Sequence, residues 1–190
     1  VSYGELLSSR IIASAFHALG LDNNWKDARE IIRTNDNYGM AAVDMEESGR
    51  RIRDHFASDA ATLAVVPGFI AADKNNITTT LGRGGSDYTA AILAAALNAE
   101  VLEIWTDVSG MMTADPRLVN NARPIPLISY QEAMELSHFG AKVIYPPTIQ
   151  PVMDKAIPVW IKNTFRPEDK GTLIRNEIHH DHDVVRGISS

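Results

Sequence analysis

Hydrophobic and polar positions follow two periods along the chain, one typical of helices and one typical of strands. Apolar residues recur at helical spacing over 5–19, and Gly20 ends that pattern. An amphipathic helix is predicted over 48–60. After Ser86 the sequence is apolar on nearly all sides, which predicts a helix buried all round.

Short apolar runs between these helices predict strands at 61–72, 77–81, 99–107 and 157–163, the first of them broken by Pro67-Gly68. Two further helices are predicted in the second half of the chain. The first covers 129–140 and carries the capping box Ser129–Glu132, and the second covers 146–156 and starts with proline. The segment 26–33 is too short for its period to be assigned.

Strands and helices therefore alternate, and most strands are apolar on both faces. This pattern predicts an α/β fold with a parallel sheet covered on both sides. Ligands in such sheets bind beyond the carboxyl ends of the strands, so the loops that follow strands are the places to look for chemistry.

Composition narrows the function. The 190 residues suit one sizeable domain or most of one. A net charge of −6 argues against general binding to nucleic acid or to an anionic membrane. For the same reason Arg50, Arg51 and Arg53 are expected to form a solvated helix face rather than a nucleic-acid patch. The chain has no cysteine, which excludes disulfides and thiolate metal sites and agrees with a cytoplasmic location. No apolar run approaches the ~20 residues of a membrane helix.

The stretch TTTLGRGGSDYTAAILAAAL, residues 78–97, takes a strand through a glycine-rich turn into the buried helix. The glycines permit positive φ and a close approach of the backbone to a ligand. Ser86 is the predicted N-cap, and the helix N–H groups would face an anion. The pattern alone also fits a tight, well-capped turn without a ligand, and both interpretations stay open here.

Two charged residues of this turn add chemistry. The guanidinium of Arg83 suits a carboxylate or phosphate. Asp87 lies in the first helical turn, where it would repel phosphate unless a cation or a lysine lies between them. Asp87 is therefore predicted to organise a transfer rather than to receive phosphate.

Two later loops follow the same logic. In 104–117, Thr106 and Asp107 could bond a ribose or an adenine edge, and Arg117 could contact phosphate. The alternative is a long surface loop. Met111 and Met112 are expected to fill the core rather than to contact a ligand. In 137–147, Lys142 could neutralise a helix C-terminus or reach the β- or γ-phosphate. His138 is expected to cap the helix or to lie at the surface rather than to act as a base.

The run HHDHD, residues 179–183, could suggest a metal site. It lies in a polar stretch after the last predicted strand, and this composition favours a solvated linker.

Five segments in register resemble aspartokinases of the amino-acid kinase family: SYGELLS, VVPGFIA, TTTLGRGGSDYTA, IWTDVSGMMTADPR and FGAKVIYPPTIQP. The resemblance covers residues 2 to about 188. It implies a three-layer αβα sandwich around a mainly parallel sheet, as in carbamate kinases. It also implies that 1–176 are the C-terminal part of the catalytic domain and that 177–190 are a linker and the start of an ACT-type regulatory region.

The implied activity is transfer of the γ-phosphoryl group of Mg-ATP to the side-chain carboxylate of L-aspartate, giving 4-phospho-L-aspartate. This is the first step of lysine, threonine and methionine biosynthesis. The resemblance further implies a cytoplasmic homo-oligomer with an amino-acid effector on downstream ACT modules, and leaves open a fused homoserine dehydrogenase. Another kinase of this fold, acting on glutamate, acetylglutamate or a nucleotide, and a non-catalytic sensor of nucleotide or amino acid stay as alternatives.

The resemblance also implies roles for individual residues. Catalytic roles fall to Asp87 and Lys142. Aspartate contacts fall to Glu5, Phe69, Arg83, Gly84, Gly85 and Ser86. Nucleotide contacts fall to Thr106, Asp107, Met112, Arg117, Lys142 and Val143, and no protein metal ligand is assigned.

The sequence departs from the family at two places. Met112 stands where many relatives have tyrosine, so a hydrogen bond to the nucleotide is lost there. The strand and KFGGTS-like loop with a catalytic lysine, which open the family's domain, do not occur. We therefore expect an excerpt that is incomplete at its N-terminus and inactive on its own.

Overall fold

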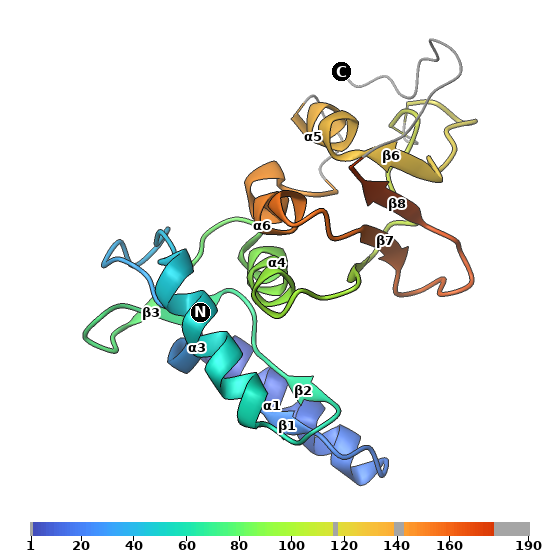
Figure 1. Cartoon of the computed structure of the whole chain (residues 1–190). Coiled ribbons are helices and arrows are strands. Elements are labelled where there is room, and N and C mark those ends of the chain that lie inside the picture. Colours follow the sequence, from blue (N-terminus) through green and yellow to red (C-terminus); the bar gives the residue numbers. More distant parts are fainter. Residues whose placement is uncertain (1, 116–117, 139–142, 177–190) are drawn as a thin grey trace. The chain divides into compact units, whose positions relative to one another are not determined.

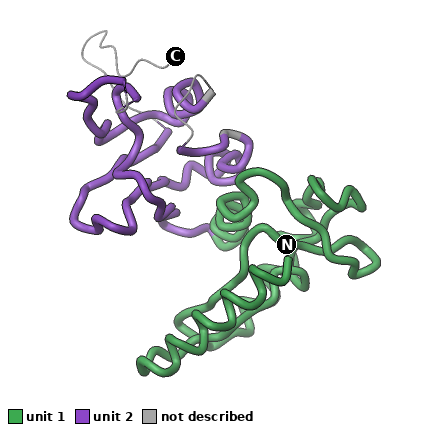
Figure 2. Tube along the Cα trace, turned by 180° about the vertical axis from the view of Figure 1, so that it is seen from behind, with its two compact units in different colours: residues 1–97 green, residues 98–190 purple. Residues whose placement is uncertain are grey.

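The computed structural model describes residues 2–115, 118–138 and 143–176 (Figure 1). The chain divides into two compact units, residues 1–97 and 98–190 (Figure 2). No helix among the described residues is both long enough and apolar enough to cross a membrane.

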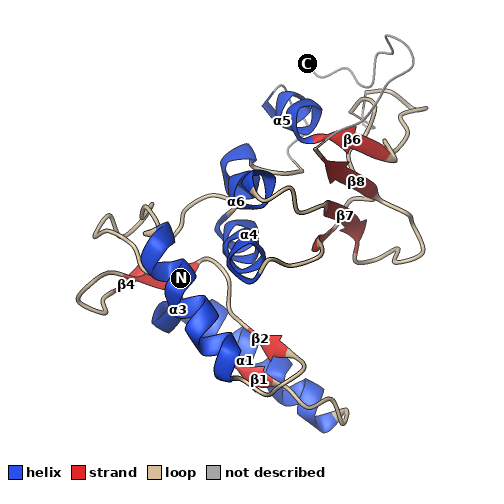
Figure 3. Ribbon diagram, viewed as in Figure 1, coloured by secondary structure: helices blue, strands red, loops and turns tan. Residues whose placement is uncertain are grey.

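Unit 1, residues 1–97, is mainly helical, with two small strand pairs (Figure 3). Strands β1 and β2 pair in parallel, whereas β3 and β4 form an antiparallel hairpin. Its elements are α1 (Ser2–Ala18), β1 (Asn24–Trp25), α2 (Ala28–Ile31), α3 (Met45–Ser58), β2 (Ala64–Val65), β3 (Ile70–Ala72), β4 (Thr78–Thr80) and α4 (Gly85–Leu97). The predicted break at Pro67-Gly68 is confirmed, because it separates β2 from β3.

One buried cluster holds unit 1 together. It joins α2, α3, β3 and α4 through side chains that are almost wholly removed from water, including Ile32, Ile52, Ile70 and Ile92. Burying an aliphatic side chain of this size stabilises the fold by about 1.5–3 kcal/mol. The short helix α2, which the sequence left unassigned, forms because Asp27 caps it: its carboxylate accepts the Arg29 N–H at 3.0 Å.

The apolar stripe of helix α1 is in large part exposed to solvent. Leu7 and Ile11 are 62 % and 68 % exposed, and the buried positions are instead the small residues Ser9 and Ala13. The reason lies in the neighbouring segment. The Trp25 indole N–H donates to Ser9 Oγ at 2.9 Å, so α1 contacts this segment through its small residues.

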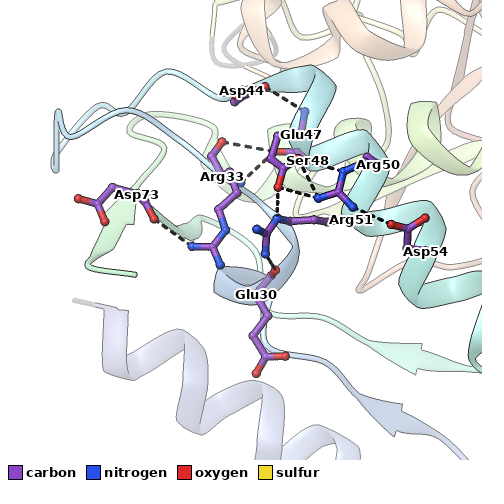
Figure 4. A network of polar contacts seen from close by, with 9 residues as sticks. All are labelled: Glu30, Arg33, Asp44, Glu47, Ser48, Arg50, Arg51, Asp54 and Asp73. Atoms are coloured by element: carbon purple, nitrogen blue, oxygen red, sulfur yellow. Dashed lines mark hydrogen bonds and ion pairs between the residues drawn. The ribbon is translucent and has the colours of Figure 1, made fainter. Parts of the chain in front are cut away.

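Helix α3 begins at Met45, three residues before the predicted start, because Asp44 caps it. Two of its arginines face carboxylates of the same helix (Figure 4): Glu47 binds both Arg50 and Arg51, and Asp54 also binds Arg50. Arg50 and Arg51 are thus engaged in ion pairs within the chain. This agrees with a solvated helix face rather than a nucleic-acid patch.

Unit 2, residues 98–190, is built on one mixed sheet in the order β5-β7-β8-β6, part of which is seen as a row in Figure 1. Two pairs, β5 with β7 and β6 with β8, are parallel, and β7 with β8 is antiparallel. Its elements are β5 (Leu102–Thr106), β6 (Leu127–Ser129), α5 (Tyr130–His138), the 3-10 helix η1 (Pro146–Ile149), α6 (Gln150–Asp154), β7 (Val159–Asn163) and β8 (Thr172–Arg175).

The α/β class is confirmed, but three details of the sheet differ from the prediction. One is the antiparallel pair β7–β8, in a sheet that was predicted to be parallel. Strands β6 and β8 were not predicted. Strand β5 is buried on one face only: Leu102 and Ile104 are buried, whereas Glu103 and Trp105 are exposed. On that exposed face the Glu103 carboxylate forms an ion pair with Lys162 of β7 at 2.7 Å. The side chains of the two strands therefore interact there through charge rather than through apolar contact.

The two predicted helices of unit 2 are present with altered ends. The capping box before α5 is confirmed, because Ser129 Oγ accepts the Glu132 N–H at 3.1 Å and Glu132 accepts the Ser129 N–H at 2.8 Å. The predicted end of α5 at Gly140 lies outside the described residues. The proline-started helix opens as η1, where Thr148 N–H bonds to Tyr145 C=O three residues back, and continues as α6.

Candidate substrate and nucleotide sites

The glycine turn joins β4 to α4 in unit 1. Gly82 and Gly84 have φ of 72° and 68°, so the predicted need for positive φ is confirmed at these two residues. The carbonyl of Gly84 accepts the Tyr88 N–H at 2.9 Å, and α4 begins at Gly85. Ser86 therefore lies inside the first turn rather than at the predicted N-cap, because the glycine backbone already enters the helix before it.

The loop Pro67–Phe69 packs directly on this turn. A Cβ atom added to Gly68 would lie 2.9 Å from Ser86 Cα, and one added to Gly85 would lie 2.8 Å from Phe69 Cδ2. Real Cβ atoms do not approach other atoms so closely. Two motifs that are separated in the sequence, VVPGFIA and GRGGSD, are thus in contact within unit 1.

Asp87 is half-buried in the first turn of α4. Within the described part of the chain its carboxylate has no hydrogen-bond partner, and burial raises its pKa above the ordinary value. An ionised carboxylate in such a place destabilises the fold. It is suited to a cation that arrives with a ligand, and this fits the organising role predicted for it.

The other predicted residues of unit 1 have different surroundings. Arg83 is exposed at the tip of the turn, and Glu5 is half-buried in the first turn of α1. Leu6, next to Glu5, packs against the same buried cluster as Phe69 and Tyr88. The start of α1 is therefore tied to the core that supports the glycine turn.

A third segment, residues 38–41, contacts the turn, and the sequence analysis missed it. Thr80 N–H donates to the Tyr38 carbonyl at 2.8 Å, and Ala41 N–H donates to the Thr80 carbonyl at 2.9 Å. The side chain of Met40 lies over Gly82, 3.3 Å from where a Cβ would stand. This segment has no apolar periodicity of its own, so no local signal in the sequence could have placed it there.

In unit 2, Thr106 ends β5, as predicted for a residue at a ligand-binding edge. Its carbonyl accepts the Thr164 N–H at 2.8 Å, and its hydroxyl donates to Asp107 Oδ1 at 3.2 Å. Asp107 is exposed. The side chains of both residues thus lie at the carboxyl edge of the sheet, where β5 and β7 end together.

The loop after Thr106 is held by side chains from the end of β7, from the segment that follows it and from the start of β8. We call these contacts the polar clamp. Asn163 Nδ2 donates to Ser109 Oγ at 2.9 Å, and Ser109 Oγ donates to Asp169 Oδ2 at 2.6 Å. The Thr172 hydroxyl accepts the Met111 N–H at 2.8 Å and donates to the Ile125 carbonyl at 2.6 Å. The sequence analysis missed the clamp, because the two partners of each of its hydrogen bonds lie more than 40 residues apart.

The two methionines of this loop behave differently. Met111 is fully buried, so its prediction as core filler is confirmed. Met112 is half-buried and forms an isolated bridge with Pro124. Val143 is also half-buried.

Several candidates lie outside the described residues: Arg117, Lys142 and the histidine run 179–183. Of His138 only the backbone, at the end of α5, is described. Among the described residues no three acidic or histidine side chains gather as metal ligands would.

Comparison with known proteins now places the chain. The family model described as "Amino acid kinase family" matches residues 1–163. The chain belongs to the amino acid kinase family. The match includes the glycine turn, the loop Pro67–Phe69, the loop after β5 and most of the sheet of unit 2.

Within the amino acid kinase family, the chain is similar to aspartokinases. The bifunctional aspartokinase/homoserine dehydrogenase of Buchnera aphidicola is 42 % identical over 190 residues, which are 100 % of this chain and 23 % of that protein. The structure of Escherichia coli aspartokinase III with aspartate and ADP (R-state) is 39 % identical and covers 94 % of this chain, with a TM-score of 0.86. The structure of the same enzyme with lysine and aspartate (T-state) has a TM-score of 0.85 at the same identity and coverage. The chain spans 40 % of aspartokinase III.

Proposed function

We propose that the protein to which this chain belongs is an aspartokinase, which transfers the γ-phosphoryl group of ATP to the side-chain carboxylate of L-aspartate. The observation that carries the proposal is the contact of Pro67–Phe69 with the glycine turn, since the resemblance assigns aspartate binding to both segments. The similarity to an aspartokinase solved with aspartate and ADP supports it. An amino-acid acceptor has two fixed charges, and the candidate residues of unit 1 offer an opposite charge for each.

In this proposal aspartate is recognised both by its charges and by its shape. Arg83 binds a carboxylate with its guanidinium fork, and Glu5 binds the amino group. Ser86 contributes a hydroxyl from the first turn of α4, where backbone N–H groups also face an anion. The ring of Phe69 closes the pocket, and Gly84 and Gly85 let the ligand approach the backbone.

The proposed transfer needs in-line positioning and neutralisation of charge on the moving phosphoryl group. Thr106, Asp107, Met112 and Val143 hold the nucleotide. Arg117 and Lys142 offset the phosphate charge. An aspartate carboxylate is already ionised at neutral pH and is itself the nucleophile, so no general base is required.

Magnesium enters the proposal with the nucleotide. Mg²⁺ is usually bound through one or two carboxylates together with substrate phosphates, rather than by a full protein cage. The half-buried Asp87 carboxylate, without a hydrogen-bond partner in the described chain, fits that chemistry. When bound, the ion would neutralise phosphate charge, and Asp87 would orient it from the protein side.

The parent protein extends the proposal beyond this chain. We place residues 1–176 in the catalytic domain and 177–190 in the approach to a regulatory region that binds an amino-acid effector. A cytoplasmic homo-oligomer fits this family assignment.

A coupled assay on the full-length parent tests the proposal, with aspartate, glutamate, acetylglutamate and UMP offered as acceptors beside Mg-ATP. Aspartate should give a kcat/KM at least about 100-fold above the other acceptors. Preference for another acceptor would assign the protein to a different kinase of the same fold. Binding of aspartate and ATP by calorimetry without turnover would identify a sensor instead.

A further inference from the structure

Phe69 is held in a backbone conformation that phenylalanine rarely adopts. Its φ is 70°, in the left-handed region, where a bulky side chain is strained. Such strain persists only when neighbouring groups fix the residue from several sides, and it gathers at ligand sites. The question is which groups fix Phe69.

Both backbone groups of Phe69 are engaged. Its carbonyl accepts the Leu81 N–H at 3.0 Å, and its N–H donates to the hydroxyl oxygen of Thr89 at 3.0 Å. Thr89 is 2 % exposed and stands one turn into α4. Its hydroxyl also donates to the Gly85 carbonyl at 2.9 Å. One buried hydroxyl therefore bridges the strained loop and the first turn of the helix.

This bridge fixes the two walls of the proposed aspartate pocket against each other. Phe69 lies on one side of it, and Ser86 follows Gly85 on the other. The two walls are tightly packed against each other, because neither Gly68 nor Gly85 has room for a Cβ atom. Loss of the hydroxyl would leave the half-buried Phe69 N–H and the buried Gly85 carbonyl without the partner that they share, and the loop could relax away from the turn.

We infer that Thr89 is a positioning residue that keeps Phe69 and Ser86 at the spacing needed for the amino-acid acceptor. The inference rests on the proposed function, because the pocket is the proposed aspartate site. Thr89 acts through the backbone of other residues and does not itself touch the substrate.

The test uses the full-length parent with Thr89→Val, which keeps the shape and removes the hydroxyl, and Thr89→Ser, which keeps the hydroxyl. A displacement of about 1 Å at a binding site can cost up to 10²-fold, so Thr89→Val should raise the KM for aspartate by roughly tenfold or more. Its KM for ATP should change by less than about twofold, and Thr89→Ser should stay within about twofold of wild type in both values.

The matched control is Thr79→Val. Thr79 is also a buried threonine of unit 1, and its hydroxyl bonds to the Thr34 hydroxyl at 2.7 Å. Thr79→Val should lower the melting temperature without raising the KM for aspartate. An unchanged KM in Thr89→Val, an equal rise in Thr79→Val, or no rescue by Thr89→Ser would overturn the inference.

Hydrogen exchange separates this inference from the proposed function. The Phe69 amide should exchange at least tenfold faster in Thr89→Val than in wild type and be protected in Thr89→Ser, whichever acceptor the enzyme uses. An unchanged exchange rate would overturn the inference even in an active aspartokinase. If wild type fails to phosphorylate aspartate, the proposed function fails, and the exchange experiment still decides whether Thr89 holds the loop. Thr89→Ala replaces Thr89→Val in both measurements if the valine variant does not fold.

Discussion

The glycine turn of unit 1 and the loop after β5 in unit 2 are both candidate ligand loops, yet they are built in opposite ways. The turn is shaped by the absence of side chains: Gly84 takes positive φ, and Gly85 leaves room for the ring of Phe69. The loop is shaped by the polar clamp, in which Ser109 is held from two directions. One region should therefore fail when atoms are added, and the other when atoms are removed.

The largest expected effect comes from Asp87, the carboxylate in the glycine turn. Asp87→Asn removes the ionised carboxylate and keeps the size of the side chain. Loss of one group that stabilises charge in a transition state costs about 10²–10³ in kcat, so a fall of that size is expected. The dissociation constant for ATP should change by less than about threefold. Steady-state kinetics and calorimetry on the full-length parent measure both values, and equal losses in the two would contradict the role given to Asp87.

Adding one methyl group to the glycine turn should have the next largest effect. In Gly85→Ala the new Cβ would meet Phe69 Cδ2 at 2.8 Å and Leu81 Cβ at 3.1 Å. Overpacking of this kind costs about 1–3 kcal/mol of unfolding free energy. The displaced Phe69 should also weaken aspartate binding. Denaturant unfolding and the KM for aspartate report the two losses.

Gly39→Ala is the control for Gly85→Ala. No atom lies within 4 Å of a Cβ placed on Gly39. The added methyl should change the unfolding free energy by less than about 0.5 kcal/mol, as for most surface substitutions. A loss as large as that of Gly85→Ala would show that steric fit does not govern the turn.

Removing atoms from the polar clamp should have a smaller effect, and on the other ligand. Ser109→Ala deletes the hydroxyl that accepts from Asn163 and donates to Asp169. Loss of a partly buried hydrogen-bonded hydroxyl costs about 1–2 kcal/mol of stability. The KM for ATP should rise by roughly three- to tenfold while the KM for aspartate is unchanged, because the loop carries only nucleotide candidates.

Gln150→Ala is the control within unit 2, since the exposed Gln150 bonds only across its own helix to Asp154 at 2.7 Å among the described residues. It should leave both KM values as they are. If Ser109→Ala also left them unchanged, the clamp would have no part in nucleotide binding.

The smallest effect concerns the dependence of stability on pH. Burial raises the pKa of Asp87 in the folded state above its unfolded value of about 3.8, so the folded state binds the proton more tightly. The stability contributed by the protonated carboxyl is present below pH 3.8 and is lost as pH rises through the folded-state pKa. Asp87→Asn should therefore melt above wild type at pH 7, and the gap should narrow as pH falls toward 3.8. A gap independent of pH would contradict this.

How far the sequence predicts each region depends on whether its determinants are local. Glycine carries its conformational freedom in its own residue type, so positive φ at Gly82 and Gly84 could be predicted. The capping box Ser129–Glu132 could be predicted for the same reason, since its partners are three residues apart. The spacing of the motifs was sufficient to predict the family.

Features that depend on distant partners could not be predicted. Ser109 meets Asp169 only because β7 runs beside β5, and Met40 reaches Gly82 only because its loop pairs with β4. The left-handed conformation of Phe69 contradicts the preference of its residue type and is fixed by contacts with Thr89 and Leu81. The apolar stripe of α1 predicts a helix but not which face is buried, because small residues set the packing against Trp25.

The uneven burial of the methionines has a practical consequence for handling the protein. Peroxide converts an accessible thioether to the sulfoxide, which is polar and bulkier. Met111 is wholly enclosed and protected, whereas Met40 is 67 % exposed and lies against Gly82. Oxidative ageing of a stored sample would therefore begin at Met40, beside the glycine turn, before it reaches Met111.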